Sequence, residues 1–135
     1  MSFSGRCLCG AVTYRCDAEP VFGAHCHCED CRRSAGTGHS SILGVPKDAF
    51  RISGSLSAYT SSADSGNAVT RHFCPTCGAP VTLTVDTMPQ LVFLRASSLD
   101  DMEVFKPQFE FYTARRASWD AIDPSLQSFE KMPPK

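Results

Sequence analysis

The chain has 135 residues, a formal net charge of −1 at pH 7 and an ordinary hydrophobic fraction of 42%. This length predicts one domain covering residues 1–135, and the near-zero charge gives no general attraction to nucleic acid or anionic lipid. No apolar run approaches the ~18 residues of a membrane-spanning helix, so neither nucleic acid nor a membrane is expected as a partner.

The N-terminal segment MSFSGRCLCG has no apolar stretch followed by a small-residue cleavage site. A cytoplasmic location is therefore expected, where thiols stay reduced. Eight cysteines in a chain of this length indicate either disulfides or metal sites. Reducing conditions favour metal sites, and a disulfide scaffold is the lesser alternative.

Alternating side chains predict a mainly β chain. In residues 11–16, Val12, Tyr14 and Cys16 fall on one face, which is typical of a half-buried strand. Cys16 is accordingly interpreted as a small buried hydrophobic residue rather than a redox group. Comparable strands are predicted over residues 21–26, 40–45, 56–61, 68–73, 81–85, 91–95 and 108–112.

Helical segments are expected to be few and short. Residues 29–34 and 118–121 can each form one turn. Asp123 followed by Pro124 has the form of an N-cap and a first helical residue, which predicts a short helix over residues 123–129. The overall prediction is a mostly antiparallel β domain whose thiols lie on loops and strand ends.

Two cysteine pairs, each followed by glycine, predict a closed metal site. The segment FCPTCG, with Cys74 and Cys77, has the form of a zinc knuckle, in which two thiolates reach one ion and the glycine permits a positive φ. Cys7 and Cys9 in GRCLCG supply the two further ligands that a structural zinc needs. Such a site would stabilise the fold directly, because metal binding and folding are coupled.

A second cluster, in the segment HCHCEDC, contains Cys26, Cys28 and Cys31 and lacks a fourth sulfur. Zinc with three protein ligands and an open position is typical of reactive sites. A zinc ion held by three thiolates is a poor activator of water, but it suits a soft external ligand such as another thiolate. The alternative is a purely structural site that a nearby histidine closes: His25, His27 or His39.

The three motifs occur in the order GRCLCG, CHCEDCR and FCPTCG. This order resembles the glutathione-dependent formaldehyde-activating (Gfa) family, whose domain also occurs in centromere protein V. The likeness covers about residues 5–129, including the strand GAVTY and the segment from Pro107 to Trp119. The tail beyond it, residues 132–135, is expected to fray.

The resemblance implies a mainly β, Mss4-like fold of coiled antiparallel β-sheets with zinc-binding cysteine motifs and short helical turns. It also implies two zinc ions per chain. The implied ligands are Cys7, Cys9, Cys74 and Cys77 for a structural zinc, and Cys26, Cys28 and Cys31 for a catalytic-type zinc that can be labile. The implied activity is that of a carbon–sulfur lyase resembling S-(hydroxymethyl)glutathione synthase, with a small-molecule thiol such as glutathione and a small aldehyde as partners.

Substrate contacts follow from position and charge. His27, or else His25, is predicted to move a proton, because an unperturbed imidazole titrates near neutrality. Arg32 directly follows the last thiolate and is predicted to bind a carboxylate of glutathione. Trp119 is expected in the core. Weaker candidates are Glu110, Arg33, Arg71, Arg95, Arg115, Arg116, Ser34, Ser40 and Ser41.

Two further functions stay open at the level of sequence. A non-catalytic zinc module could bind a protein or nucleic acid, although no basic stripe interleaved with aromatic residues supports nucleic-acid binding. A redox role like that of methionine sulfoxide reductases would need a reactive cysteine free of metal, and Cys16 is poorly suited to it.

Overall fold

The alternating segment near the N-terminus forms a strand at the centre of a small sheet. In the computed structural model, which describes residues 2–63 and 65–133, β2 (Thr13–Cys16) buries Tyr14 and Cys16 and exposes Thr13 and Arg15. β1 (Phe3–Arg6) and β5 (Phe50–Ser53) pair antiparallel with its two edges. Neither flanking strand is predicted from the sequence, because β1 has Phe3 as its one large apolar residue and β5 is mostly exposed.

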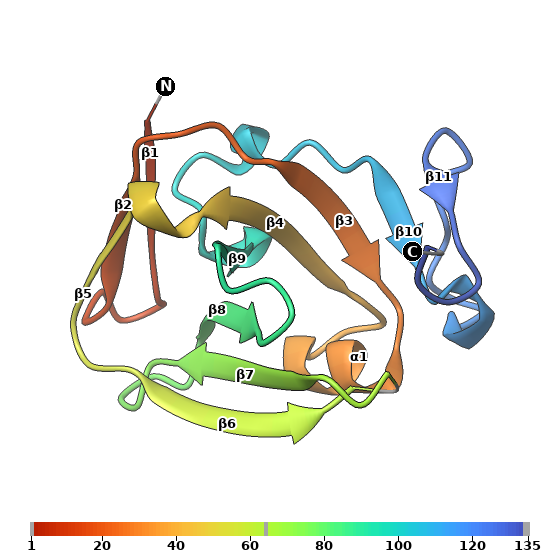
Figure 1. The fold of residues 1–135 in the computed structure, drawn as a ribbon, viewed down its shortest axis with the longest axis horizontal. Helices are drawn as coiled ribbons and strands as arrows, with labels where there is room; N and C mark the ends of the chain where they lie inside the picture. The colour runs from red at the N-terminus through yellow and green to blue at the C-terminus, as the bar shows by residue number, and fades with distance from the viewer. Residues whose placement is uncertain (1, 64, 134–135) are drawn as a thin grey trace.

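A second, larger sheet has eight strands in the order β11-β10-β3-β4-β9-β8-β7-β6. In Figure 1 it curves from the C-terminal strands, across β3 and β4, to β7 and β6. β10 runs parallel to both β3 and β11, and the other pairs are antiparallel. The strands are β3 (Phe22–Cys26), β4 (Ser40–Pro46), β6 (Ser57–Ser62), β7 (Ala68–Phe73), β8 (Pro80–Val85), β9 (Leu91–Arg95), β10 (Phe109–Phe111) and β11 (Gln127–Ser128).

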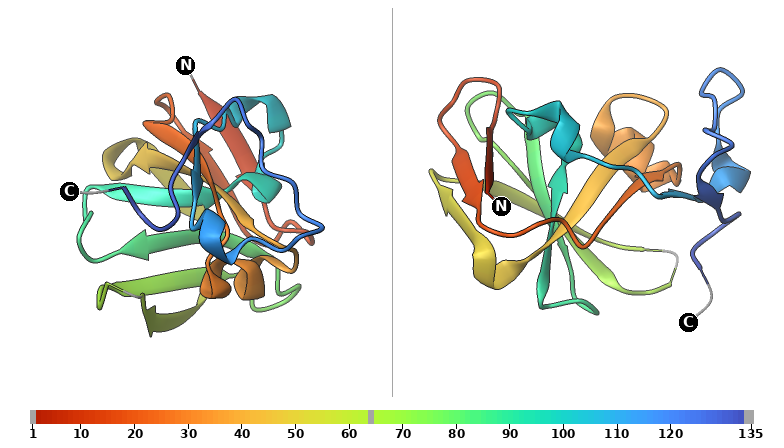
Figure 2. Two further views of the ribbon diagram at one scale, coloured as in Figure 1. Left: turned by 90° about the vertical axis from the view of Figure 1, so that its right-hand side faces the viewer. Right: turned by 90° about the horizontal axis from the view of Figure 1, so that it is seen from above.

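The main hydrophobic core joins the two sheets. Phe3 and Tyr14 from the small sheet belong to the same buried cluster as Leu43, Val45 and Leu94 from β4 and β9. Figures 1 and 2 show the small sheet at one end of the molecule and the segment after β10 at the other. The mainly β, mostly antiparallel architecture predicted from the sequence is confirmed.

One α-helix is present among the described residues. α1 (Glu29–Ala35) forms where one turn is predicted, and it ends at Gly36 in the left-handed region with φ 81°. The described residues also contain four short 3₁₀ turns: η1 (Lys47–Ala49), η2 (Ala96–Ser98), η3 (Met102–Val104) and η4 (Thr113–Arg115). Within the described ranges, no helix has the length and apolarity needed to cross a bilayer.

The C-terminal segment differs from the sequence prediction. The helix predicted over residues 123–129 is wrong: the Asp123 carboxylate accepts bonds from the backbone and hydroxyl of Ser125 in a turn, and β11 follows. The free edge of β10 decides this outcome, because Phe129 donates its N–H to the Glu110 carbonyl at 2.9 Å.

The neighbouring segment 118–121 also lacks the predicted helical turn. Instead, the backbone N–H of Asp120 donates a hydrogen bond to the Ala117 carbonyl at 3.0 Å, which closes a single turn. Trp119 is 73% exposed, so its predicted place in the core is wrong. Of the tail predicted to fray, residues 134–135 lie outside the described residues.

Candidate metal centres

The first cysteine cluster joins the small sheet to the large one. Cys7 and Cys9 follow β1, while Cys74 and Cys77 lie in the turn between β7 and β8. The Sγ atoms of Cys7 and Cys9 are 3.7 Å apart, and those of Cys9 and Cys74 are 3.8 Å apart. Four sulfurs about 2.3 Å from one tetrahedral zinc lie roughly 3.8 Å from one another, so the cluster fits this ion.

Local backbone geometry prepares these sulfurs for a cation. Cys74 Sγ accepts the N–H groups of Thr76 and Cys77, both at 3.4 Å. Gly78, directly after the second pair, has φ 77°, as the knuckle motif predicts. Hydrogen bonds to backbone groups lower the pKa of Cys77 to about 6, with the largest effect from Ala79 and the next from Cys9. The turn therefore favours the thiolate form that binds metal.

The second cluster lies where β3 passes into α1. Cys26 ends β3, Cys28 is the N-cap of α1, and Cys31 lies in its first turn, with its N–H bonded to Cys28 Sγ at 3.3 Å. The three sulfurs lie within 4.8 Å of one another. Hydrogen bonds from the Cys26 and Cys31 thiols lower the pKa of Cys28 to about 2, and the same sharing raises the pKa of Cys26.

Within residues 2–63 and 65–133, no histidine belongs to this three-sulfur group. His27 and His39 instead form a separate group with Asp120, and His25 Nδ1 lies 2.8 Å from Ser41 Oγ. The donor set of three thiolates thus suits a soft divalent ion with a position left for an external ligand.

Two arginines lie beside the three-cysteine cluster. Arg95 on β9 is 3% exposed, and it donates to Ser40 Oγ at 2.6 Å and Ser34 Oγ at 3.1 Å. Burial lowers the pKa of Arg95, whereas the negative charge of the Cys31 sulfur raises it. Arg71 on β7 also acts on the cluster electrostatically and donates to Ser61 Oγ at 3.0 Å.

Both guanidinium groups keep a hydrogen-bond donor without a partner among the residues described. The Nε atoms of Arg71 and Arg95 are buried and have no hydrogen-bond partner within the described part of the chain. Arg32, the preferred contact at the level of sequence, is half-buried on α1, and its backbone N–H bonds the Cys28 carbonyl. Arg33 is at the surface and pairs with Glu29 at 3.0 Å.

A third group consists of His27, His39 and Asp120, and only His27, between Cys26 and Cys28, is close to the thiols in sequence. His27 Nε2 lies 2.7 Å from Glu110 Oε1, and both side chains are buried. His39 Nδ1 is 2.6 Å from Asp120 Oδ2. The sequence suggested a role for Glu110 near the site, but it gave no signal for Asp120, which lies 81 residues after His39 in a turn without a motif.

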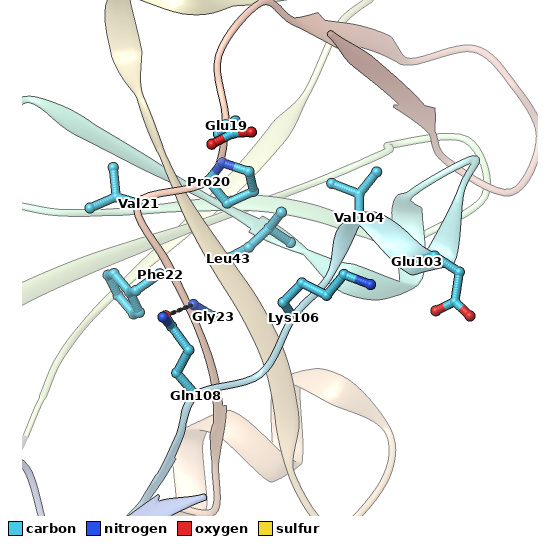
Figure 3. Close-up of a pocket in the computed structure, with 10 residues that line it drawn as sticks. All are labelled: Glu19, Pro20, Val21, Phe22, Gly23, Leu43, Glu103, Val104, Lys106 and Gln108. Atoms are coloured by element: carbon cyan, nitrogen blue, oxygen red, sulfur yellow. Dashed lines mark hydrogen bonds between the residues drawn. The ribbon is translucent and has the colours of Figure 1, made fainter. Parts of the chain in front are cut away.

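Neither of two clefts described in the structure includes a residue of the three-cysteine cluster. Figure 3 shows the first, of about 270 Å³, at the start of β3, where the N–H of Gly23 donates to Gln108 Oε1 at 3.2 Å. The cysteines lie at the opposite end of that strand. A volume below the ~300 Å³ of typical small-molecule sites makes this cleft a weak candidate for a substrate.

These features define a mainly β protein with two cysteine groups that can hold zinc. Residues 2–115 match the family model described as glutathione-dependent formaldehyde-activating enzyme. The chain belongs to this family, as the order of its cysteine motifs predicts.

The comparison with solved structures adds support for the fold. The chain is similar to the crystal structure of a Rhodobacter sphaeroides protein, a structural genomics target, with a TM-score of 0.57 and 21% identity. The match covers 72% of this chain and 87% of that protein. A comparison with curated proteins gave no match.

Proposed function

We propose that this protein catalyses the reversible addition of a low-molecular-weight thiol to a small aldehyde, formally the reaction of a carbon–sulfur lyase. The observation that carries the proposal is the three-cysteine cluster, which has no fourth sulfur or histidine among the described residues and lies beside Arg71 and Arg95. Glutathione and formaldehyde are the proposed pair, because the family description names them.

The cluster fits zinc, since its soft donors are grouped within 4.8 Å and Cys28 is readily anionic. Zinc held by Cys26, Cys28 and Cys31 would supply an open coordination position that lowers the pKa of a bound thiol and makes it a nucleophile. A reducing compartment such as the cytoplasm would keep these ligands free, consistent with eight free cysteines.

The arginines provide the complementary charge. Glutathione carries two carboxylates, and a guanidinium binds a carboxylate through paired N–H groups. Arg71 and Arg95 each retain a buried Nε–H without a partner among the described residues, and such a donor gains from an anionic ligand. Arg32, next to Cys31, remains a predicted outer contact.

The predicted proton-transfer role of His27 is not retained in this proposal. His27 is 1% exposed, and its Nε2 is paired with Glu110. Successive residues of an extended segment point to opposite sides, so the imidazole of His27 points away from the side that carries Cys26 and Cys28. The imidazole therefore lies on the opposite side of the segment from the proposed thiol site.

The test measures exchange between free formaldehyde and its glutathione adduct by NMR in the zinc-loaded protein. We expect acceleration over the uncatalysed exchange, and the Arg71→Gln variant should need about tenfold more glutathione for half-saturation, since a lost charged hydrogen bond is worth about 1.5 kcal/mol. Arg33→Gln is the matched control, because that side chain is exposed and pairs with Glu29.

Exchange at the uncatalysed rate in protein that contains zinc at both cysteine clusters would refute the proposed activity. It would leave the non-catalytic zinc module as the function to pursue. Equal effects of Arg71→Gln and Arg33→Gln would refute the assignment of Arg71 to the thiol substrate while leaving the activity itself intact.

A further inference from the structure

His27 is a buried imidazole between two carboxylates, and the proposed thiol chemistry does not use it. Its side chain is 1% exposed, with Nε2 2.7 Å from Glu110 Oε1 and Nδ1 3.4 Å from Asp120 Oδ2. Nδ1 is buried and makes no hydrogen bond to any described residue. A buried polar atom without a partner is rare and destabilises the fold, which suggests that Nδ1 has a partner from outside the chain.

The pairing with Glu110 determines what His27 can offer. With Glu110 ionised, its carboxylate only accepts hydrogen bonds, and Nε2 of His27 then carries the proton that the two groups share. In the neutral imidazole the lone pair is then on Nδ1, where it faces the Asp120 carboxylate. Two electron-rich atoms 3.4 Å apart in a buried site repel each other unless a cation lies between them.

His39 completes a set of three donors around this position. The ligand atoms of His27, His39 and Asp120 all lie within 4.8 Å of one another. Nitrogen and oxygen ligands about 2.1 Å from a tetrahedral metal are roughly 3.4 Å apart, which agrees with the distance from His27 to Asp120. His39 Nδ1 and Asp120 Oδ2 are closer, at 2.6 Å, because they share a hydrogen bond. A metal ion would replace this hydrogen bond and increase the distance between the two atoms.

We propose that His27, His39 and Asp120 form a third metal site, which binds a divalent first-row transition metal such as Zn²⁺. Glu110 orients His27 from behind, the carboxylate–histidine arrangement common around metal ions. Two neutral imidazoles and one carboxylate leave a divalent ion with a net positive charge, unlike the three-thiolate cluster. An ion here is the stronger Lewis acid and prefers an oxygen or nitrogen ligand in its open position.

The two neighbouring sites use opposite sides of one short segment. Cys26 and Cys28 direct sulfur to one side, and His27 directs its imidazole to the other. His39 and Asp120 are half-buried, with 25% and 13% of their side chains exposed, so an ion can reach the site from solvent. The inference does not depend on the proposed activity, because its test measures bound metal.

The experiment titrates the metal-free full chain with Zn²⁺ and, separately, with Co²⁺, whose absorption distinguishes thiolate from nitrogen and oxygen ligands. We expect three ions per chain at saturation, one for each group. Asp120→Asn and His39→Gln should each remove one ion and leave the cobalt–thiolate charge-transfer band unchanged. His27 itself is left in place, because a change there would disturb the flanking cysteines.

Gly38 and Gly36 offer a matched pair of variants in one loop. A Cβ at Gly38 would lie 2.6 Å from Asp120 Oδ2, so Gly38→Ala should displace that carboxylate and lose the third ion. A Cβ at Gly36 meets no atom within 4 Å, so Gly36→Ala should keep all three ions despite its φ of 81°. His72→Gln is the control for loss of a histidine whose buried Nδ1 also has no described partner.

Saturation at two ions per chain, both bound to thiolate, would overturn the third site. In that case the protonation of His27 can be measured by NMR. Protons on both ring nitrogens would show that the imidazolium itself, rather than a metal ion, lies between the carboxylates of Glu110 and Asp120. Retention of three ions by both Asp120→Asn and His39→Gln would also overturn it, since the third ion would then lie elsewhere.

Discussion

At the scale of the residue, the Tyr14 hydroxyl links the small sheet to η2. It lies 2.6 Å from Ser98 Oγ, and burial raises the pKa of Tyr14 to about 12 from its ordinary value of 10. We expect Tyr14→Phe to lower the free energy of unfolding by about 1 kcal/mol, because Ser98 keeps its bond to the Arg95 carbonyl. Urea unfolding of the zinc-loaded protein below pH 10 measures this difference.

The same side chain predicts a pH dependence. Because the pKa of Tyr14 is higher in the folded than in the unfolded chain, its contribution is complete below pH 10 and is lost as pH rises toward 12. The Phe variant should therefore lose less stability than the wild type over that range. Tyr59→Phe is the control, since Tyr59 is 66% exposed. Parallel pH curves for wild type and Tyr14→Phe would contradict this account.

At the scale of the element, Cys28 serves both the metal cluster and α1. As N-cap, its sulfur accepts the Cys31 N–H, a role that a serine hydroxyl fills well and alanine cannot. We expect Cys28→Ser and Cys28→Ala both to lose the ion of the three-cysteine cluster, with the Ala variant about 1 kcal/mol less stable than the Ser variant. Metal analysis and urea unfolding measure the two effects, and equal stabilities would contradict the capping role.

At the scale of the whole molecule, the four-cysteine cluster closes a long loop. Cys9 and Cys74 are 65 residues apart and join the two sheets, so a metal bound there stabilises the complete domain. We expect Cys74→Ser to lower Tm by roughly 10 °C or more or to prevent folding. Cys31→Ser should lower Tm by only a few degrees, because its cluster lies within one short segment.

Thermal unfolding together with zinc content per chain tests this contrast between the two clusters. Equal losses of Tm in Cys74→Ser and Cys31→Ser would contradict the division into a structural and a functional metal site. Tm unchanged in Cys74→Ser would show that the two sheets hold together through the hydrophobic core alone.

The cysteine motifs, the strand alternation and the family all follow from the sequence, because each motif and each strand depends on spacing over a few residues. One or two intervening residues determine whether sulfurs such as Cys26 and Cys28 can reach one ion, and period two determines which side chains of β2 are buried. The helix α1 is likewise a local property, capped by Cys28 and ended by Gly36.

Only the tertiary structure decided which distant groups meet. The order of strands brings Arg71 and Arg95 to the three-cysteine cluster, and Glu110 reaches His27 across 83 residues because β10 pairs with β3. The other edge of β10 turned the predicted C-terminal helix into β11, since an open strand edge outweighed a local capping signal. Trp119 is exposed for a similar reason: its turn directs Asp120, rather than the indole, toward the histidines.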